Sequence, residues 1–155
     1  MWIRTHHSWS CIIHQDYYNW KLTIVDDNSN KKTKDILKKF SKNKKIKIYW
    51  LKKNKGAGFC RNYALKKTKS PYIAFIDSDD IWKKNKLKVQ LKYFNNKNIG
   101  FTTSNSVFFD EKNEKNFYPD NKRFNKNIFY DLIKNYFISF DTVIIKTSKL
   151  NELKK

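Results

Sequence analysis

Hydrophobic positions along the chain switch between the spacing typical of strands and the spacing typical of helices. Segments 20–25, 46–50 and 72–76 are apolar or alternate apolar with polar residues, which predicts strands. Between them, segments 36–40 and 59–65 carry apolar or helix-favouring residues among lysines, which predicts helices. This order of elements indicates an α/β sandwich with a largely parallel sheet.

The second half of the chain continues the pattern with longer polar interruptions. Apolar residues recur at helical spacing over 87–94, and the segments 101–109 and 142–145 resemble strands. The polar stretch 110–127 predicts a long surface loop, and long loops in compact domains are often functional. Segment 128–136 is predicted to be a helix.

Length and composition indicate one domain spanning residues 1–155, with no internal repeat or linker. With 39% hydrophobic and 17% aromatic residues, the chain can form a core. It has no apolar run near the ~20 residues of a membrane span, and its start lacks the apolar core of a signal peptide. Two distant cysteines, Cys11 and Cys60, fit a reducing compartment. We therefore expect a soluble, cytoplasmic protein.

The charge balance is strongly basic, with 34 Lys and Arg against 14 Asp and Glu and a net charge of +20. Such a field attracts nucleic acids or anionic membranes. The lysines are spread along the chain beside Asn and Ile, which is typical of a general compositional bias and of solvated lysine faces. All three interpretations stay open, although the aromatic residues mostly occupy predicted core positions, which counts against nucleic acid.

Carboxylates, scarce elsewhere, gather directly after two predicted strands. Asp26 and Asp27 follow one strand, and Asp77, Asp79 and Asp80 follow another. Like charges about 4 Å apart repel by about 4 kcal/mol near a protein surface, so a metal ion, a basic side chain or a helix N-terminus is expected among them. Ligands bind at the carboxyl ends of strands in open α/β sheets. The alternative is that these aspartates cap the helix that follows.

Four sequence segments, in order, carry a resemblance to a known family. They are SCIIHQDYYNWKLTIVDDNSN, NKGAGFCRNYALKKTKSPYIAFIDSDDIW, FTTSNSVFFDEKNEK and ISFDTVIIKTSKL. Together they resemble the family 2 glycosyltransferases, which have the GT-A fold, a three-layer sandwich that binds nucleotide-sugars. The resemblance implies inverting transfer of a sugar from a nucleotide donor, a UDP-sugar by family preference, to a glycan or lipid-linked acceptor in cell-surface polysaccharide synthesis. Work on lipid-linked acceptors would place the protein peripherally on the inner membrane face.

The resemblance also implies roles for particular residues. Asp27, with Asp26 beside it, matches the acidic residue that recognises the nucleobase, and Arg61 matches an arginine near the nucleotide. Asp77 matches the contact to ribose or diphosphate. Asp79, the second carboxylate of the DxD motif, matches the ligand of Mg²⁺ or Mn²⁺.

The resemblance departs from the family pattern at both ends of the chain. Family members begin with a central strand, but the residues before Trp20 match the helix that follows that strand. The acidic pair that carries the catalytic base in relatives has no counterpart before Lys155, so the base is unknown. We therefore expect a partial domain truncated at both ends. A non-catalytic nucleotide-sugar or metal-binding fragment and a basic nucleic-acid-binding protein remain as alternatives.

Overall fold

The computed structural model of the 155-residue chain describes residues 5–109, 114–116 and 138–152. The chain is organised as two compact units. Unit 1 comprises Met1–Ser70 and Ile81–Leu87, and unit 2 comprises Pro71–Asp80 and Lys88–Lys155.

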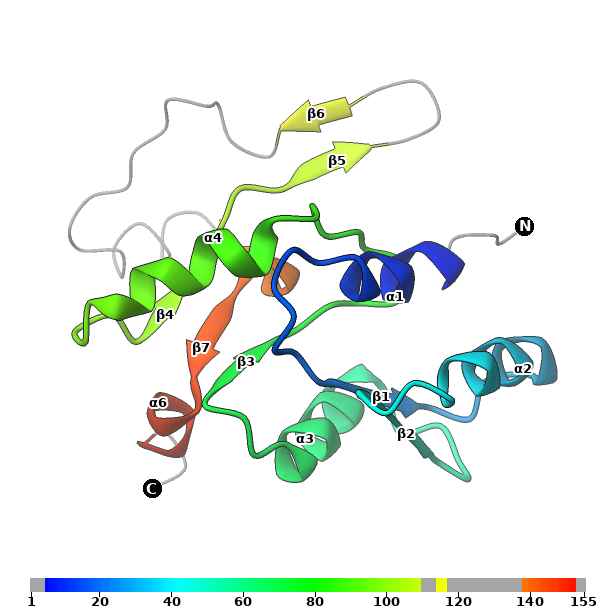
Figure 1. The fold of residues 1–155 in the computed structure, drawn as a ribbon. Helices are drawn as coiled ribbons and strands as arrows, with labels where there is room; N and C mark the ends of the chain where they lie inside the picture. Colours follow the sequence, from blue (N-terminus) through cyan, green and yellow to red (C-terminus); the bar gives the residue numbers. More distant parts are fainter. Residues whose placement is uncertain (1–4, 110–113, 117–137, 153–155) are drawn as a thin grey trace. The chain divides into compact units, whose positions relative to one another are not determined.

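Unit 1 alternates helices with parallel strands (Figure 1). Its elements are α1 (Thr5–Ile13), β1 (Leu22–Asp26), α2 (Lys31–Phe40), β2 (Ile46–Trp50) and α3 (Ala57–Lys67). Strands β1 and β2 pair in parallel, in a register that joins Leu22 to Ile46 and Asp26 to Trp50. These elements confirm the two strands and two helices that the sequence predicts here.

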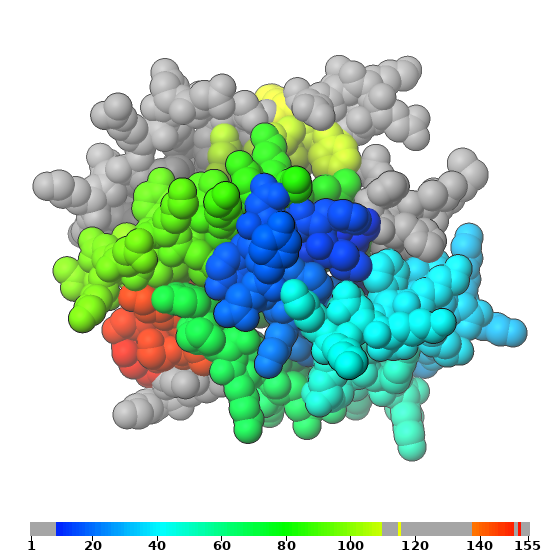
Figure 2. Space-filling model, in the orientation of Figure 1, coloured from blue at the N-terminus to red at the C-terminus, as the bar shows by residue number. Residues whose placement is uncertain are grey.

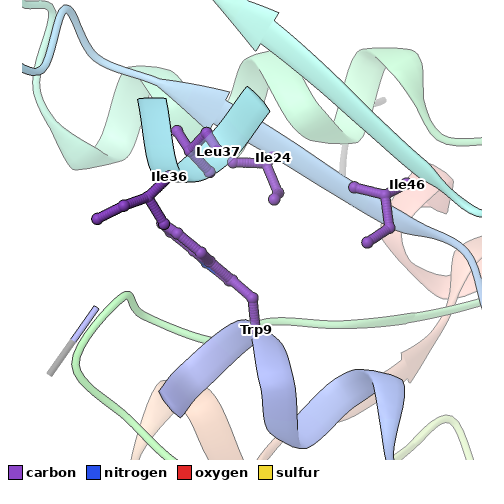
Figure 3. Packing of buried hydrophobic residues seen from close by; sticks show 5 residues of the cluster. All are labelled: Trp9, Ile24, Ile36, Leu37 and Ile46. Carbon is purple, nitrogen blue, oxygen red and sulfur yellow. The ribbon is translucent and has the colours of Figure 1, made fainter. Parts of the chain in front are cut away.

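One face of the β1–β2 sheet forms the hydrophobic core of unit 1 with α1 and α2. Figure 3 shows Trp9 of α1 and Leu37 of α2 facing Ile24 of β1, with Ile46 of β2 alongside. Leu37 is 1% exposed. Helix α2 buries one side only, and the cyan residues around position 40 project from the molecular surface (Figure 2).

The opposite face of the same sheet is covered by α3. Because side chains alternate along a strand, Lys47 and Tyr49 point away from the face that holds Ile46. There the ring of Tyr49 meets Tyr63 of α3 edge-on, with centroids 5.5 Å apart. Unit 1 therefore has the predicted three layers, helices on both faces of a parallel sheet.

A buried glutamine ties the separate segment Ile81–Leu87 to the rest of unit 1. The side-chain amide of Gln15 donates to the carbonyl of Lys83 at 2.9 Å and accepts from the backbone N–H of Leu87 at 3.1 Å. The backbone N–H of Asp16 donates to the carbonyl of Lys84 at 2.9 Å. These bonds hold the segment that directly follows the acidic residues Asp77, Asp79 and Asp80.

Unit 2 is built around an antiparallel sheet in which β7 lies between β3 and β4. Its elements are β3 (Tyr72–Ala74), α4 (Lys86–Lys92, which begins in unit 1), the 3₁₀ turns η1 (Tyr93–Asn95) and η2 (Phe140–Thr142), β4 (Phe101–Thr102), β5 (Val107–Phe109), β6 (Glu114–Asn116), β7 (Ile144–Lys146) and α6 (Thr147–Glu152). Strands β5 and β6 form a separate antiparallel hairpin.

Unit 2 departs from the predicted strand boundaries in three places. The strand predicted over 101–109 is two strands separated by the polar residues 103–106. There Asn105 accepts from the N–H of Ser106, and the hydroxyl of Thr103 bonds with that of Thr142. The strand predicted over 72–76 ends at Ala74. Strand β6 lies within the predicted loop 110–127.

The remaining predictions for unit 2 have mixed outcomes. The helix expected over 87–94 appears as α4 followed by η1, and the strand expected over 142–145 is β7, displaced by up to two residues. The helix predicted over 128–136 and most of the loop before it lie outside the described residues.

Candidate functional site

Asp26 ends strand β1 as a buried carboxylate with one oxygen available. Asp26 is only 3% exposed, and its Oδ2 accepts a hydrogen bond from the backbone N–H of Ser29 at 3.2 Å. The next turn is sharp, since Asn28 has φ 60°. Among the described residues, Oδ1 of Asp26 has no hydrogen-bond partner. A buried acceptor left unsatisfied costs about 1–3 kcal/mol, so this oxygen favours a ligand that brings a donor.

Asp27 connects the end of β1 to the start of α3. Its Oδ1 accepts from the backbone N–H of Lys55 at 2.7 Å, and its Oδ2 accepts from that of Gly56 at 2.8 Å. Gly56 precedes α3 with φ 83°, a conformation that favours glycine. Each carboxylate oxygen has two lone pairs, so Asp27 keeps acceptor capacity.

Helix α3 brings a thiol to the end of unit 1 that holds Asp26 and Asp27. Burial raises the pKa of the Cys60 thiol, and Asp27, which contacts it, and Asp26 raise it further. Arg61 follows Cys60 on α3 and is partly buried. The structure therefore brings Asp26, Asp27 and Cys60 together, with Arg61 adjacent on the same helix.

The second acidic loop is a turn after β3 in unit 2. The backbone N–H of Asp80 donates to the carbonyl of Asp77 at 3.3 Å, and Asp79 lies exposed within this turn. Helix α4 begins only at Lys86. The alternative that these aspartates cap the following helix is therefore wrong for this loop, because the helix starts too far along the chain.

A fourth carboxylate, Asp141, joins this turn from a distant part of the chain. The pKa of Asp80 is raised to about 6, first by burial and then by the charges of Asp141, Asp79 and Asp77. The antiparallel register of β3 with β7 explains the meeting, because Ala74 pairs with Ile144. Asp77 follows Ala74 by three positions and Asp141 precedes Ile144 by three, so both lie beyond the same end of this strand pair.

Asp141 is held in place by packing and hydrogen bonds within unit 2. The rings of Phe75 and Phe140 pack with centroids 4.3 Å apart, and the hydroxyl of Ser139 bonds to Asp141. Next to it, the carbonyl of buried Thr142 accepts from buried Gln90 at 3.0 Å. No local sequence pattern predicts a role for Asp141, because its position depends on the strand register of β3 with β7.

The donor groups of unit 2 fit a hard divalent cation bound together with a phosphate ligand. Within the described ranges, no three or more His, Cys, Asp or Glu side chains are arranged to hold a metal by themselves. Mg²⁺ typically uses one or two carboxylates plus phosphate oxygens and water. Burial first, and then the charges of Asp141, Asp79 and Asp77, raise the pKa of Asp80, and a cation near Asp79 would offset those negative charges.

A parallel α/β unit with acidic residues after its strands, joined to an antiparallel sheet, is the architecture of GT-A glycosyltransferases. The family model for glycosyl transferase family 2 matches residues 5–153. The chain belongs to this family.

Two Escherichia coli enzymes illustrate the similarity to curated relatives. WfgD, a UDP-Glc:alpha-D-GlcNAc-diphosphoundecaprenol beta-1,3-glucosyltransferase, is 36% identical over 144 residues, covering 92% of this chain and 54% of WfgD. WfaP, with the same described activity, is 41% identical over 93 residues, covering 59% of this chain and 36% of WfaP. The chain thus spans about half or less of the length of these relatives.

Solved structures agree on the fold. TarS 1-349 from S. aureus in complex with UDP matches with a TM-score of 0.69 at 20% identity, over 97% of this chain and 45% of that one. The mannosyltransferase PcManGT from Pyrobaculum calidifontis, in complex with GDP-Man and Mn²⁺, matches with a TM-score of 0.68 at 14% identity, over 94% of this chain and 41% of that one. In the part of this chain that is described, no helix has the length and apolar character needed to cross a membrane.

Proposed function

We propose that this chain binds a UDP-sugar together with Mg²⁺ or Mn²⁺ and serves in inverting sugar transfer to a glycan or lipid-linked acceptor during cell-surface polysaccharide synthesis. The family supports the reaction class. The described activities of WfgD and WfaP, which use UDP-Glc and a diphosphoundecaprenol-linked sugar, support the donor and acceptor. Such a protein would work in the cytoplasm, on the inner face of the membrane.

In unit 1 the proposed ligand is the nucleobase. A uracil ring presents an N–H donor, and the unpartnered Oδ1 of Asp26 and the remaining lone pairs of Asp27 are acceptors at the end of β1. Arg61 on α3 supplies a fixed guanidinium suited to a phosphate or to base edges. Asp27 is thereby the recognition residue, and Asp26 is the buried acceptor beside it.

In unit 2 the proposed ligands are the diphosphate, its ribose and the cation. Asp79 would hold the metal and Asp77 the ribose or diphosphate. The observation that carries the proposal is the gathering of Asp77, Asp79 and Asp141 around Asp80, whose pKa is raised to about 6 first by burial and then by their negative charges. When bound, the metal would supply positive charge that stabilises the leaving nucleoside diphosphate.

Inverting transfer also requires a general base to take the proton from the acceptor hydroxyl. The proposal gives that role to no residue of this chain. Donor binding is therefore the property to test first, and transfer is a separate measurement.

Calorimetric titration of UDP into the chain, with and without Mn²⁺, tests the proposal. We expect binding that strengthens with Mn²⁺ and that loses its metal dependence in Asp79→Ala. Asp35→Ala is the matched control, because it also removes one aspartate, from an exposed ion pair with Lys38 on α2. Asp27→Asn should weaken UDP binding with and without metal.

The alternatives give different results. A non-catalytic binding fragment would bind UDP in this way yet transfer no sugar from UDP-glucose to any lipid-linked acceptor. A nucleic-acid-binding protein would bind a DNA duplex tightly, with affinity that falls steeply as salt rises, and would ignore UDP. Equal UDP binding by Asp79→Ala and the unmodified chain in Mn²⁺ would overturn the assigned metal ligand.

A further inference from the structure

The basic charge of the chain is concentrated in unit 1. Counting by sequence, unit 1 has 21 Lys and Arg and 4 Asp, a formal charge of +17, whereas unit 2 has 13 and 10, a formal charge of +3. A general compositional bias toward lysine would raise the formal charge of both units alike. The asymmetry indicates that unit 1 faces an anionic partner.

The four carboxylates of unit 1 are too few to pair with its lysines. Asp16 pairs with Lys84 at 3.1 Å and Asp35 with Lys38 at 3.1 Å. Asp26 and Asp27 accept backbone N–H groups. Most lysines of unit 1 therefore have no carboxylate of the same unit left to pair with.

One surface of unit 1 combines these lysines with aromatic rings. Phe59, Tyr63 and Lys67 lie four residues apart on α3 and so share one side of the helix. The Phe59 and Tyr63 rings stack with centroids 6.3 Å apart, and Tyr63 meets Tyr49 of β2. Lys47 of β2 completes this set of five residues, which we name the aromatic–lysine stripe.

The lysines of the stripe are held against its rings. The Nζ atom of Lys67 lies 5.8 Å from the ring centroid of Tyr49 and 5.5 Å from that of Tyr63, and Nζ of Lys47 lies 5.5 Å from Tyr49. Such cation–π contacts keep the ammonium groups at the level of the rings. The stripe thus presents apolar edges and positive charge at one surface.

The stripe is not part of the hydrophobic core. Helix α3 is described throughout and has no buried residue, and Phe59 is 45% exposed. Strand β2 has β1 as its only partner among the described strands, so the stripe lies at an edge of that sheet. Further exposed lysines precede α3 and continue through its C-terminal end: Lys52, Lys53, Lys55, Lys66 and Lys69.

We propose that the aromatic–lysine stripe docks unit 1 on the surface of an anionic lipid bilayer. The exposed ring of Phe59 would insert at the headgroup boundary, while the lysine ammonium groups remain among the phosphates. This inference rests on the proposed function only in that a lipid-linked acceptor would be presented at such a surface.

Lipid fits the stripe better than nucleic acid. Single-stranded nucleic acids stack their bases on open aromatic faces in a basic groove. Here the Tyr49 and Tyr63 rings are occupied by each other and by Lys67. Phe59, the exposed aromatic residue of the stripe, offers apolar area at a helix surface, which suits shallow insertion into a bilayer.

Co-sedimentation of the full chain with vesicles tests the proposal. We expect strong binding to phosphatidylcholine vesicles containing 30% phosphatidylglycerol and little binding to pure phosphatidylcholine. Each lysine at an anionic surface contributes about fivefold in partitioning, so Lys47→Gln/Lys67→Gln should bind about 25-fold more weakly. Phe59→Ala leaves the charge unchanged, and its loss of binding should persist in high salt.

Lys32→Gln/Lys39→Gln is the matched control, because it removes the same charge from exposed positions of α2. We expect this variant to lose less than threefold. Equal losses in the two double variants would overturn the assignment of the stripe, as would equal binding to neutral and anionic vesicles. A preference for single-stranded DNA over the anionic vesicles that depends on the stripe would also overturn it.

Two further measurements separate this proposal from others. Circular dichroism melting should give the same unfolding temperature for all four proteins, because the altered side chains are outside the core. UDP binding should be unchanged in the stripe variants. If the chain binds UDP but does not bind anionic vesicles, the proposal that the stripe docks on a membrane is wrong and the proposed function still stands.

Discussion

Replacing Asp141 by Asn should make Asp80 a stronger acid. Burial and the charges of Asp141, Asp79 and Asp77 raise the pKa of Asp80 from 3.8 to about 6, and among those charges Asp141 ranks first. Asparagine keeps the shape of the side chain and an oxygen that can still accept from Ser139. The substitution therefore removes one negative charge with little change in packing, and the pKa of Asp80 should fall toward 3.8.

The same change should stabilise the fold at neutral pH. A carboxyl whose pKa is higher in the folded chain than in the unfolded chain favours unfolding once it ionises, so stability falls as pH rises from about 4 to about 6. The whole difference from 3.8 to about 6 corresponds to at most about 3 kcal/mol. Solvent screens these partly exposed groups, so we expect Asp141→Asn to raise the unfolding free energy by about 0.5–1 kcal/mol at pH 7.5.

Two assays check this reasoning. Carbon-13 NMR of the aspartate carboxyls gives the apparent pKa of Asp80 directly, and urea unfolding followed by far-UV circular dichroism at pH 4.5 and 7.5 gives the stability. Tryptophan fluorescence would not serve, because all five Trp lie in unit 1. Asp35→Asn on α2 is the control and should leave Asp80 unchanged. Two results would refute the proximity of the two carboxyls. One is a pKa of Asp80 near 4 in the unmodified chain, and the other is the same pKa of Asp80 in the unmodified chain and in Asp141→Asn.

Two other predictions concern the loop and helix around Asp27. Gly56→Ala should lower the free energy of unfolding of unit 1 by about 1–2 kcal/mol in urea unfolding, because φ is 83° there. Gly58→Ala, inside α3 and with equally open space for a Cβ, is the control and should be neutral or stabilising. Equal effects of the two substitutions would mean that the strained turn at Gly56 is absent. Asp27→Asn should lower the pKa of the Cys60 thiol and so speed its alkylation by iodoacetamide at pH 8 by about threefold. The internal control is Cys11, whose thiol accepts from the N–H of Trp82. An unchanged alkylation rate at Cys60 would show that Asp27 is not close to the thiol.

Local patterns were sufficient to predict most of unit 1. Strands β1 and β2 and helix α2 each show their own periodicity within about ten residues, and their core positions follow from it, whereas α3 is predicted from its helix-favouring residues. Asp26 and Asp27 were predicted as a site because acidic residues directly follow an apolar strand. The contact of Asp27 with the N–H groups of Lys55 and Gly56 was not predicted, since it depends on how a loop 28 residues away folds back.

Unit 2 was predicted less well because its structure depends on pairings between distant segments. Strands of two or three residues carry too few positions to show alternation, so the split between β4 and β5 was missed. No role was predicted for Asp141, because its place beside Asp80 follows from the antiparallel register of β7 with β3. A local pattern does not contain that information.

The separation of charge between the units gives the acidic turn of unit 2 a physical rationale. A carboxylate cluster within a uniformly basic protein would be neutralised by neighbouring lysines and would bind a cation weakly. Here most of the excess positive charge lies in unit 1, and unit 2 has a formal charge of only +3. Within unit 2, burial and then the charges of Asp141, Asp79 and Asp77 raise the pKa of Asp80 to about 6. A basic unit attracts an anionic nucleotide or lipid surface, and a carboxylate cluster attracts a cation. Both attractions should weaken as salt rises, so UDP association rates and vesicle binding should fall with ionic strength even where the bound contacts are unchanged.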